Sequence, residues 1–270
     1  MLLFGGVYSP VSIRLTPCIA GSRMAGHSKW KQIKHYKAAT DKKRGALFTR
    51  LIREITVAAK QGGGDPGGNP RLRTAIDTAK AASMPKENID RTVKKGTGEL
   101  EGVDYVEVLY EAYGPGGVAL MIQALTDNPT RTVADVRFKL SRGGGNLGAT
   151  NSVAWMFDRK GQIYLDATKH DEDDALSRAL EAGAEDCVRE DDQYVVSTEA
   201  TSVHAVKEAL EAAGLVPTEV EIAWVPKNTV HVAGEDAAAL VKLLDALDEL
   251  DDVQKVDANF DMDVSEMAGT

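Results

Sequence analysis

The chain has 270 residues, of which 43% are hydrophobic and 27% charged, and its formal net charge is −9. This composition is ordinary for a globular protein and argues against wholesale disorder. No stretch has the uninterrupted apolar length that spans a bilayer, so a membrane protein is not expected. Two cysteines, Cys18 and Cys187, are too few for a disulfide framework or a zinc site. The length suits two or three small domains.

The first 23 residues contain two arginines and no acid, and a second methionine follows at Met24. Pro10 and Pro17 interrupt both the apolar run of a secretory signal and the amphipathic helix of a mitochondrial transit peptide. We therefore expect residues 1–23 to be a leader or a mis-assigned start, with Met24 beginning the functional chain. The expected location is the cytoplasm, with the mitochondrion as the alternative if residues 1–23 are a transit peptide.

Positive charge is concentrated in residues 24–95, which carry a net charge of +11, whereas residues 96–270 carry −22. The run AGHSKWKQIKHYKAATDKKRG, residues 25–45, contains Asp41 as its only acid. A face that is merely solvated normally mixes both signs. The asymmetry therefore predicts a basic module that binds a polyanion, joined to an acidic body that repels it.

Apolar spacing predicts a helical bundle in residues 24–98. Helices are expected from Ser28, over about residues 45–60, from Pro70 after a cap at Asn69, and after Pro85 as far as Gly96. Lysines and arginines lie off the apolar stripes of these helices, which gives the bundle cationic outer surfaces.

Cationic surfaces of this kind contact phosphates, giving affinity and salt dependence without base specificity. Histidine and aromatic residues interleaved with the lysines can stack on exposed bases, which favours folded RNA over a duplex. Trp30 suits the bundle core even better. Two arginines of the body, next to the glycine-rich turn at 143–145, join the set. The residues expected to contact nucleic acid are Lys29, Trp30, Lys31, Lys34, His35, Lys37, Lys42, Lys43, Arg44, Arg50, Arg53, Arg71, Arg73, Arg131 and Arg142.

From residue 104 the periodicity changes to alternating strands and helices. Two strands are expected on either side of a tight reversal at residues 113–116, followed by a helix that begins near Asn128. Two further strands are expected to flank Arg159, Lys160 and Gly161. The remaining prediction is helices at about 171–182, 201–213 and 235–249, with strands near 194–197, 219–225, 228–234 and 255–261.

Sequence patterns of catalysis are weak. GGGNLG at 143–148 spells a dinucleotide-binding motif, but it follows a helix and precedes a strand, the reverse of the required context. DEDD at 171–174 suits the first turn of a helix better than a metal site, because carboxylates there complement the helix dipole. His170, His204 and His231 are scattered along the chain, without a paired metal ligand or a nearby nucleophile. We therefore predict no catalytic residue, metal, cofactor or small-molecule substrate.

Five motifs resemble the YebC family: the run from Met24 to Ile55, GGGDPGGNPRLRTAI, YEAYGPGGVALMI, TDNPTRTVADVR and GGNLGATNSVAWMF. The resemblance extends from Met24 to the end of the chain. It implies an α+β multidomain protein, in which an N-terminal helical bundle (24–98) precedes two α+β domains. One of these is discontinuous (99–159 and 226–270), and the other, ferredoxin-like, is inserted in it (160–225).

The resemblance also implies a regulator of gene expression. Family members are labelled transcriptional regulators, and some are implicated as ribosome-associated factors that assist synthesis of difficult stretches such as consecutive prolines. Mitochondrial translational activators of cytochrome c oxidase belong to the same family. We favour a non-enzymatic translation factor that binds ribosomal RNA. A DNA-binding transcriptional regulator is the alternative, although no helix-turn-helix spacing is evident, and an enzyme is the weakest interpretation.

Overall fold

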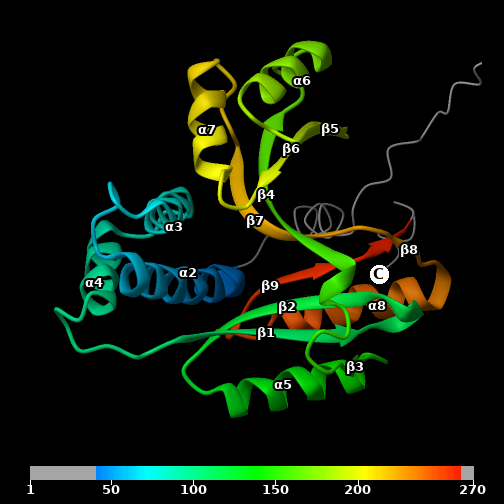
Figure 1. Cartoon of the computed structure of the whole chain (residues 1–270). Helices are drawn as coiled ribbons and strands as arrows, with labels where there is room; N and C mark the ends of the chain where they lie inside the picture. Colours follow the sequence, from blue (N-terminus) through cyan, green and yellow to red (C-terminus); the bar gives the residue numbers. More distant parts are fainter. Residues whose placement is uncertain (1–40, 263–270) are drawn as a thin grey trace, which may run out of the picture.

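The structure, a computed structural model, describes residues 41–262, with side chains described from Gly45 onward. It is a mixed α/β protein with seven α-helices in this range and sheets that are mainly antiparallel. Three parts meet around the first described helix (Figure 1). They are a helical part, a lower sheet with its helices and an upper sheet with its helices. None of the helices in residues 41–262 is long and apolar enough to cross a membrane.

The helical part has a core of interlocking aliphatic side chains, as its apolar spacing predicts. Leu51 and Ile55 pack against Leu72 and Ile76. The expected cap at Asn69 is confirmed: its side chain accepts a hydrogen bond from the Leu72 amide, and it also donates to two backbone carbonyls at the end of the preceding helix. The helices are α2 (Asp41–Gly62), α3 (Pro70–Ala81) and α4 (Lys86–Gly96).

The lower sheet has the strand order β3-β1-β2-β9. The predicted reversal is confirmed, because Tyr113 pairs with Ala119 across a turn that contains Gly116 at φ +68°. Two helices, α5 (Pro129–Arg142) and α8 (Gly234–Asp248), pack on one face. The strands are β1 (Val106–Tyr113), β2 (Ala119–Thr126), β3 (Asn146–Leu147) and β9 (Val253–Ala258), and a parallel pair, β8 (Val230–His231) and β10 (Phe260–Asp261), lies beside them.

The upper sheet is built from the chain between β3 and β8, so strands of the lower sheet precede and follow it in sequence. Its strand order is β5-β6-β4-β7, all antiparallel, and its element order is βαββαβ, the pattern of ferredoxin-like units. The elements are β4 (Phe157–Asp166), α6 (Glu172–Glu181), β5 (Asp186–Glu190), β6 (Gln193–Glu199), α7 (Val203–Ala212) and β7 (Glu219–Pro226).

The expected break at Arg159, Lys160 and Gly161 is wrong, because these residues lie inside β4. Lys160 pairs with Glu199 on one side and with Ala223 on the other, so the strand runs on unbroken. The glycine serves close packing rather than a turn: a Cβ at Gly161 would lie 2.6 Å from the Cβ of Val203 in α7. Of the strand expected before the break, residues 154–156 form a short 3-10 turn, Ala154–Met156, and Phe157 and Asp158 begin β4.

Two strands were not predicted, and each lacks a clear apolar alternation. The five residues of β5 are all exposed or half-buried. The strand β3 has only two residues, and its pairing with Ala112 and Tyr113 of β1 is what defines it. Short edge strands of this kind are set by the neighbouring strand more than by their own sequence.

Candidate nucleic-acid interface

The predicted contact residues fall into three groups in the structure. Lys29, Trp30, Lys31, Lys34, His35 and Lys37 lie outside the described residues. Lys42, Lys43 and Arg44 lie in the first four residues of α2, but their side chains are outside the described part as well. The other six can be placed: Arg50, Arg53, Arg71, Arg73, Arg131 and Arg142.

Arg50 and Arg53, on α2, point toward the acidic body. Arg50 Nη1 lies 3.2 Å from Asp248 Oδ1, and its other terminal nitrogen donates to the Asp248 carbonyl. Arg53 Nη1 lies 2.9 Å from Asp252 Oδ1, donates to the Asp251 carbonyl, and its guanidinium carbon lies 5.5 Å from the Tyr105 ring centroid. Both arginines are off the core stripe of α2, as predicted, but their partners are carboxylates of the body.

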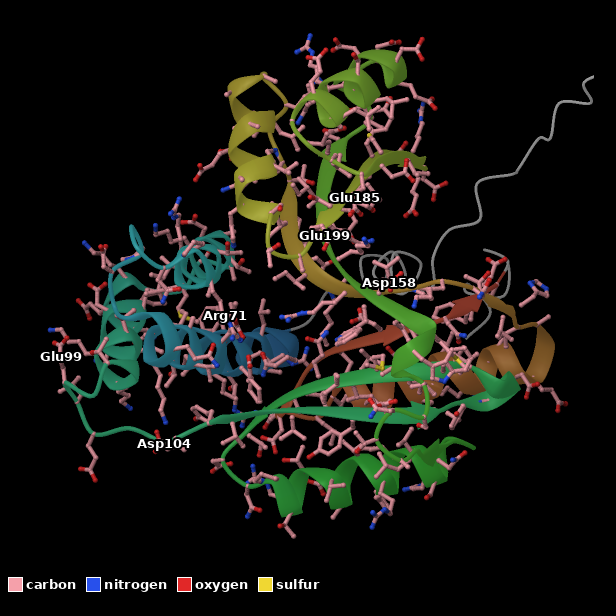
Figure 2. All side chains as sticks on the ribbon, in the orientation of Figure 1. Arg71, Glu99, Asp104, Asp158, Glu185 and Glu199 are labelled. Carbon is pink, nitrogen blue, oxygen red and sulfur yellow. The ribbon has the colours of Figure 1, made fainter. Side chains whose placement is uncertain are left out.

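Arg71 and Arg73, on α3, also have acidic partners. Arg71, labelled in Figure 2, lies on α3. It makes a forked contact with Glu54 of α2, with Nε 2.7 Å from Oε1, and pairs with Glu107 of β1. The two carboxylates outweigh burial and raise the pKa of the Arg71 guanidinium above its ordinary value. Arg73 Nη1 lies 3.2 Å from Glu208 of α7. These pairs connect the helical part to both sheets.

Asp252 is the most buried carboxylate at this junction. Besides Arg53, it accepts hydrogen bonds from Arg131 (2.9 Å), Thr132 (2.6 Å) and Thr126 (3.2 Å). Burial by itself would raise its pKa, but the hydrogen bonds from Thr132 and Arg131 and the charge of Arg53 outweigh burial and hold the pKa below its usual range. Arg131, one of the predicted contacts, is therefore shared between Asp252 and Asp127.

Arg142 is the predicted contact with no acidic partner among the described residues. Its guanidinium carbon lies 5.7 Å from the ring centroid of Phe138, one helical turn earlier on α5. Both side chains are exposed, and the Phe138 residue retains 58% of its accessible surface.

Other exposed cations were missed by the sequence prediction. Those that form no ion pair with another residue of the described chain lie mainly on α4. Their signal in the sequence is weak, because the acids Glu87 and Asp90 are mixed among them. The set comprises Lys86, Arg91, Lys94 and Lys95 on α4, Arg137 on α5, Arg159 on β4 and Lys242 on α8.

A loop that carries Trp155 and is hydrogen-bonded to Glu111 was also not singled out from the sequence. The buried carboxylate of Glu111 accepts hydrogen bonds from the backbone amides of Asn151 (2.6 Å), Val153 (2.7 Å) and Ala154 (2.8 Å). Burial opposes ionisation, but these amides outweigh it and lower the pKa of Glu111. Trp155 is 66% exposed, and its indole nitrogen donates to the Ser152 carbonyl.

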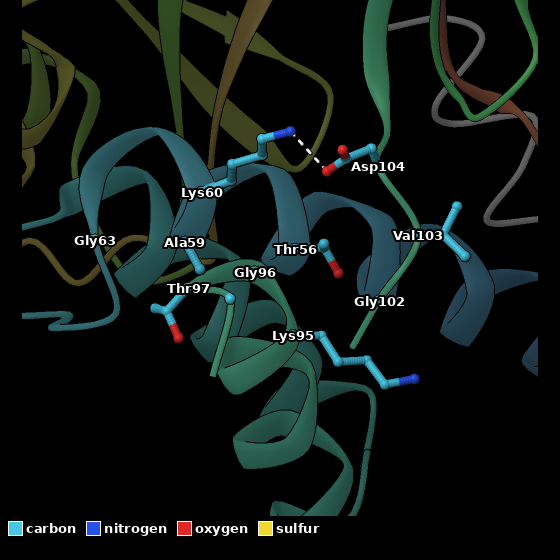
Figure 3. Close-up of a pocket in the computed structure, with 11 residues that line it drawn as sticks. Thr56, Ala59, Lys60, Gly63, Lys95, Gly96, Thr97, Gly102, Val103 and Asp104 are labelled. Carbon is cyan, nitrogen blue, oxygen red and sulfur yellow. Dashed lines mark hydrogen bonds and ion pairs between the residues drawn. The ribbon is translucent and has the colours of Figure 1, made fainter. Parts of the chain in front are cut away.

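A cavity of about 420 Å³ opens where the C-terminal ends of α2 and α4 meet the segment leading to β1 (Figure 3). At its edge, Lys60 Nζ lies 2.7 Å from Asp104. Glycine backbone and the side chains of Lys95 and Thr97 complete much of the lining, and no histidine or cysteine is part of it. No group of three potential metal ligands occurs in residues 41–262.

DEDD at 171–174 forms the start of α6, with Glu172, Asp173 and Asp174 in the first turn. Asp174 pairs with Arg178 one turn later at 2.8 Å. This arrangement agrees with the prediction that the carboxylates complement the helix dipole.

Comparisons with known proteins cover nearly all of the described chain. Residues 28–99 match the family described as TACO1/YebC protein N-terminal domain, and residues 105–260 match the TACO1/YebC second and third domain. A probable transcriptional regulatory protein of Gemmatimonas aurantiaca is 70% identical over 91% of this chain and 99% of its own length. A probable transcriptional regulatory protein of Acidithiobacillus ferrooxidans is 56% identical over 91% of this chain and 98% of its own length.

A crystal structure of a conserved hypothetical protein from Aquifex aeolicus is similar with a TM-score of 0.80 and 49% identity, covering 87% of this chain and 97% of that one. The matches to the family span well over half of the sequence, and they agree with the five motifs found in it. The chain belongs to the TACO1/YebC family.

Proposed function

We propose that the protein is a non-enzymatic, nucleic-acid-binding regulator of gene expression, anchored to its polyanion by the basic N-terminal part. The separation of charge carries this proposal: +11 in residues 24–95 against −22 in residues 96–270. A concentrated cationic surface attracts phosphates, while the acidic body discourages indiscriminate coating of nucleic acid. A cytoplasmic location stays a prediction.

The ion pairs of the described chain reduce the set of residues proposed to contact nucleic acid. Arg50, Arg53, Arg71 and Arg73 each have a carboxylate partner, so they stabilise the junction between the helical part and the rest. Binding phosphates through them would require those pairs to open. The proposed primary contact is therefore Lys42, Lys43 and Arg44 together with the lysines of residues 29–37. The cations of α4 that are unpaired in the described chain are additional candidates, and α4 packs against the C-terminal half of α2.

We further propose the domain division that the resemblance implies: residues 24–98, then 99–159 with 226–270, and an inserted unit at 160–225. The return of β9 to pair with β2, after the whole of the upper sheet, supports this division. In this arrangement Arg71 pairs with Glu107 of β1 and Arg73 with Glu208 of α7, so ion pairs connect the helical part to both α+β units.

The relatives' names support DNA as the polyanion, because they read probable transcriptional regulatory protein. Ribosomal RNA, and with it a role in translating stretches such as consecutive prolines, is the second candidate. It is favoured by His27, Trp30, His35 and Tyr36, which alternate with the lysines of residues 29–37. Such rings stack on unpaired bases, which folded RNA offers and a regular duplex does not.

The test replaces Lys42, Lys43 and Arg44 with alanine. A matched control replaces three cations of the upper unit and its margin, Lys169, Lys207 and Lys227, whose exposed ion pairs contribute little to stability. We expect the first variant to bind a ribosomal RNA fragment and a DNA duplex more weakly. The slope of log affinity against log salt should fall by about 0.7 to 0.9 for each phosphate that the variant no longer binds. The control variant should bind both probes as the parent does. Equal losses of affinity in both variants would mean that net charge alone, and not a site in the basic part, determines binding.

The nucleic acid that co-purifies with the tagged parent protein distinguishes RNA from DNA as the partner. Ribosomal particles that the parent binds, and that the triple variant releases at lower salt, would support translation. Enrichment of particular promoter fragments, abolished in the triple variant while ribosome association persists, would support transcription.

A further inference from the structure

The outward face of α5 is a basic strip on an otherwise acidic body. Residues 96–270 contain 13 lysines and arginines, and four of them lie in the 14 residues of α5 with Asp135 as the only acid. The rest of that region carries 9 cations against 34 acids, so positive charge on α5 is a local exception. In Figure 1, α5 lies at the lower edge of the molecule with no other element outside it.

Two of the four cations on α5 have no acidic partner in the described chain. Arg131 pairs with Asp127 and Asp252, and Lys139 lies 3.7 Å from Glu249. Arg137 and Arg142 form no ion pair with a described residue. The helix dipole accounts for cations in the last turn, which contains Lys139 and Arg142. It does not account for Arg137 or for an exposed aromatic ring between two arginines.

Phe138 occupies the middle of the exposed arc of α5. Thr132, Val136 and Leu140 form the buried side. At about 100° of rotation per residue, Arg142 follows Phe138 by about 40° around the helix, and Arg137 precedes it by about 100°. Small residues, Ala134 and Ser141, occupy the arc between Phe138 and Arg137.

Two planar groups are therefore presented together, a phenyl ring and a guanidinium 5.7 Å from its centroid. Planar aromatic and guanidinium groups are the surfaces on which unpaired bases stack, and a neighbouring arginine supplies a phosphate contact. Bases within a regular duplex are already stacked and are not accessible in this way.

We propose that the outward face of α5, formed by Arg137, Phe138 and Arg142, binds unpaired bases of single-stranded nucleic acid as a second contact. The proposal rests on the proposed function, since it assumes that the basic N-terminal part brings the polyanion to the protein. It adds the preference for unpaired strands and places a contact within the acidic body.

The experiment uses the full chain and two fluorescein-labelled probes, a 12-nucleotide RNA single strand of mixed sequence and a DNA duplex of equal length. Phe138→Ala is expected to weaken binding of the single strand by at least about fivefold, the lower end of the stacking contribution, and to change duplex binding less than twofold. Phe138→Leu keeps an apolar side chain without a π face, and it should weaken binding of the single strand as much as Phe138→Ala does. Arg142→Lys tests the planar guanidinium at constant charge and should weaken binding of the single strand alone.

Matched controls separate this surface from general effects. Leu180→Ala removes an exposed apolar side chain from α6, and Lys169→Ala removes one cation at the far end of the upper unit. Both should bind the two probes as the parent does. A single-stranded DNA of the same sequence decides between the two sources of unpaired bases: equal effects on both strands support stacking alone, and a larger effect on RNA supports stacking with recognition of RNA.

Two results would overturn the α5 proposal. One is Phe138→Ala binding the single strand within twofold of the parent, which would show that Phe138 does not stack on its bases. The other is an equal loss of affinity for the single strand and the duplex. The Lys42, Lys43 and Arg44 triple variant keeps the two proposals apart. If that variant loses affinity for both probes while Phe138→Ala does not, only the α5 proposal fails. If the triple variant binds both probes normally, the proposed function fails.

Discussion

Removing the charge of Asp252 should loosen the junction between the helical part and the lower sheet. The change is Asp252→Asn, which keeps the size of the side chain. In the parent, Arg53 and Asp252 retain only 11% and 9% of their side-chain exposure, and their charged atoms lie 2.9 Å apart. Breaking a buried ion pair by neutralising one partner typically costs about 3 to 5 kcal/mol, because the other charge stays buried without compensation.

We expect a loss of stability near the lower end of that range, about 3 kcal/mol, because the amide still accepts hydrogen bonds from Thr126 and Thr132. The measurement is urea denaturation at low salt, since urea, unlike guanidinium chloride, does not screen ion pairs. Asp251→Asn is the matched control. It is the preceding residue, it is exposed, and its carboxylate forms no ion pair with another described residue, so its replacement should cost less than about 0.5 kcal/mol.

A double-mutant cycle with Arg53→Gln tests the pairing itself. If the two side chains interact as the distance indicates, the double variant should be more stable than the sum of the single losses predicts, by about 1 to 3 kcal/mol. Additive losses, or an Asp252→Asn variant no less stable than Asp251→Asn, would refute the argument that this pair stabilises the junction.

Three other predictions concern single sites. Glu111→Gln should lower the free energy of unfolding by about 2 kcal/mol, because the variant cannot form the charge-assisted hydrogen bonds to the loop amides. Since the pKa of Glu111 is lowered by folding, its contribution is present above the unfolded pKa and is lost as the pH falls through the folded value. The free energy of unfolding, measured by urea denaturation between pH 3 and pH 7, should therefore depend less on pH in the variant than in the parent at the acidic end. Burial raises the pKa of the Cys187 thiol to about 11. In a Cys18→Ser background, iodoacetamide at pH 8 should modify it about a hundredfold more slowly in the folded chain than in urea, and equal rates would contradict the burial argument. Gly161→Ala should lower the free energy of unfolding, measured by urea denaturation, by about 1 to 3 kcal/mol, because the new Cβ would lie 2.6 Å from the Val203 Cβ. Adding Val203→Ala should restore part of that loss. If it does not, the strain does not come from the contact with Val203.

Much of the helical part could be predicted from local sequence. The stripe of Leu51 and Ile55 and the cap at Asn69 each specify a helix through contacts a few residues apart, and the structure contains those helices. The uneven distribution of charge is likewise a property of the sequence alone. These features do not depend on which distant segments meet, so apolar spacing and cap chemistry are sufficient to find them.

The orientation of the cations depended on tertiary structure. Arg53 and Asp252 are far apart in the chain, and only the return of β9 to the lower sheet brings Asp252 to α2. The strand through Gly161 is a second example. Its local sequence resembles a turn, but pairing on both sides and the close approach of Val203 determine a continuous strand. Sequence by itself therefore determined where positive charge and helices occur, while the packing of the three parts decided which of those charges face carboxylates and which face solvent, because ion pairing depends on distances that only the folded chain defines.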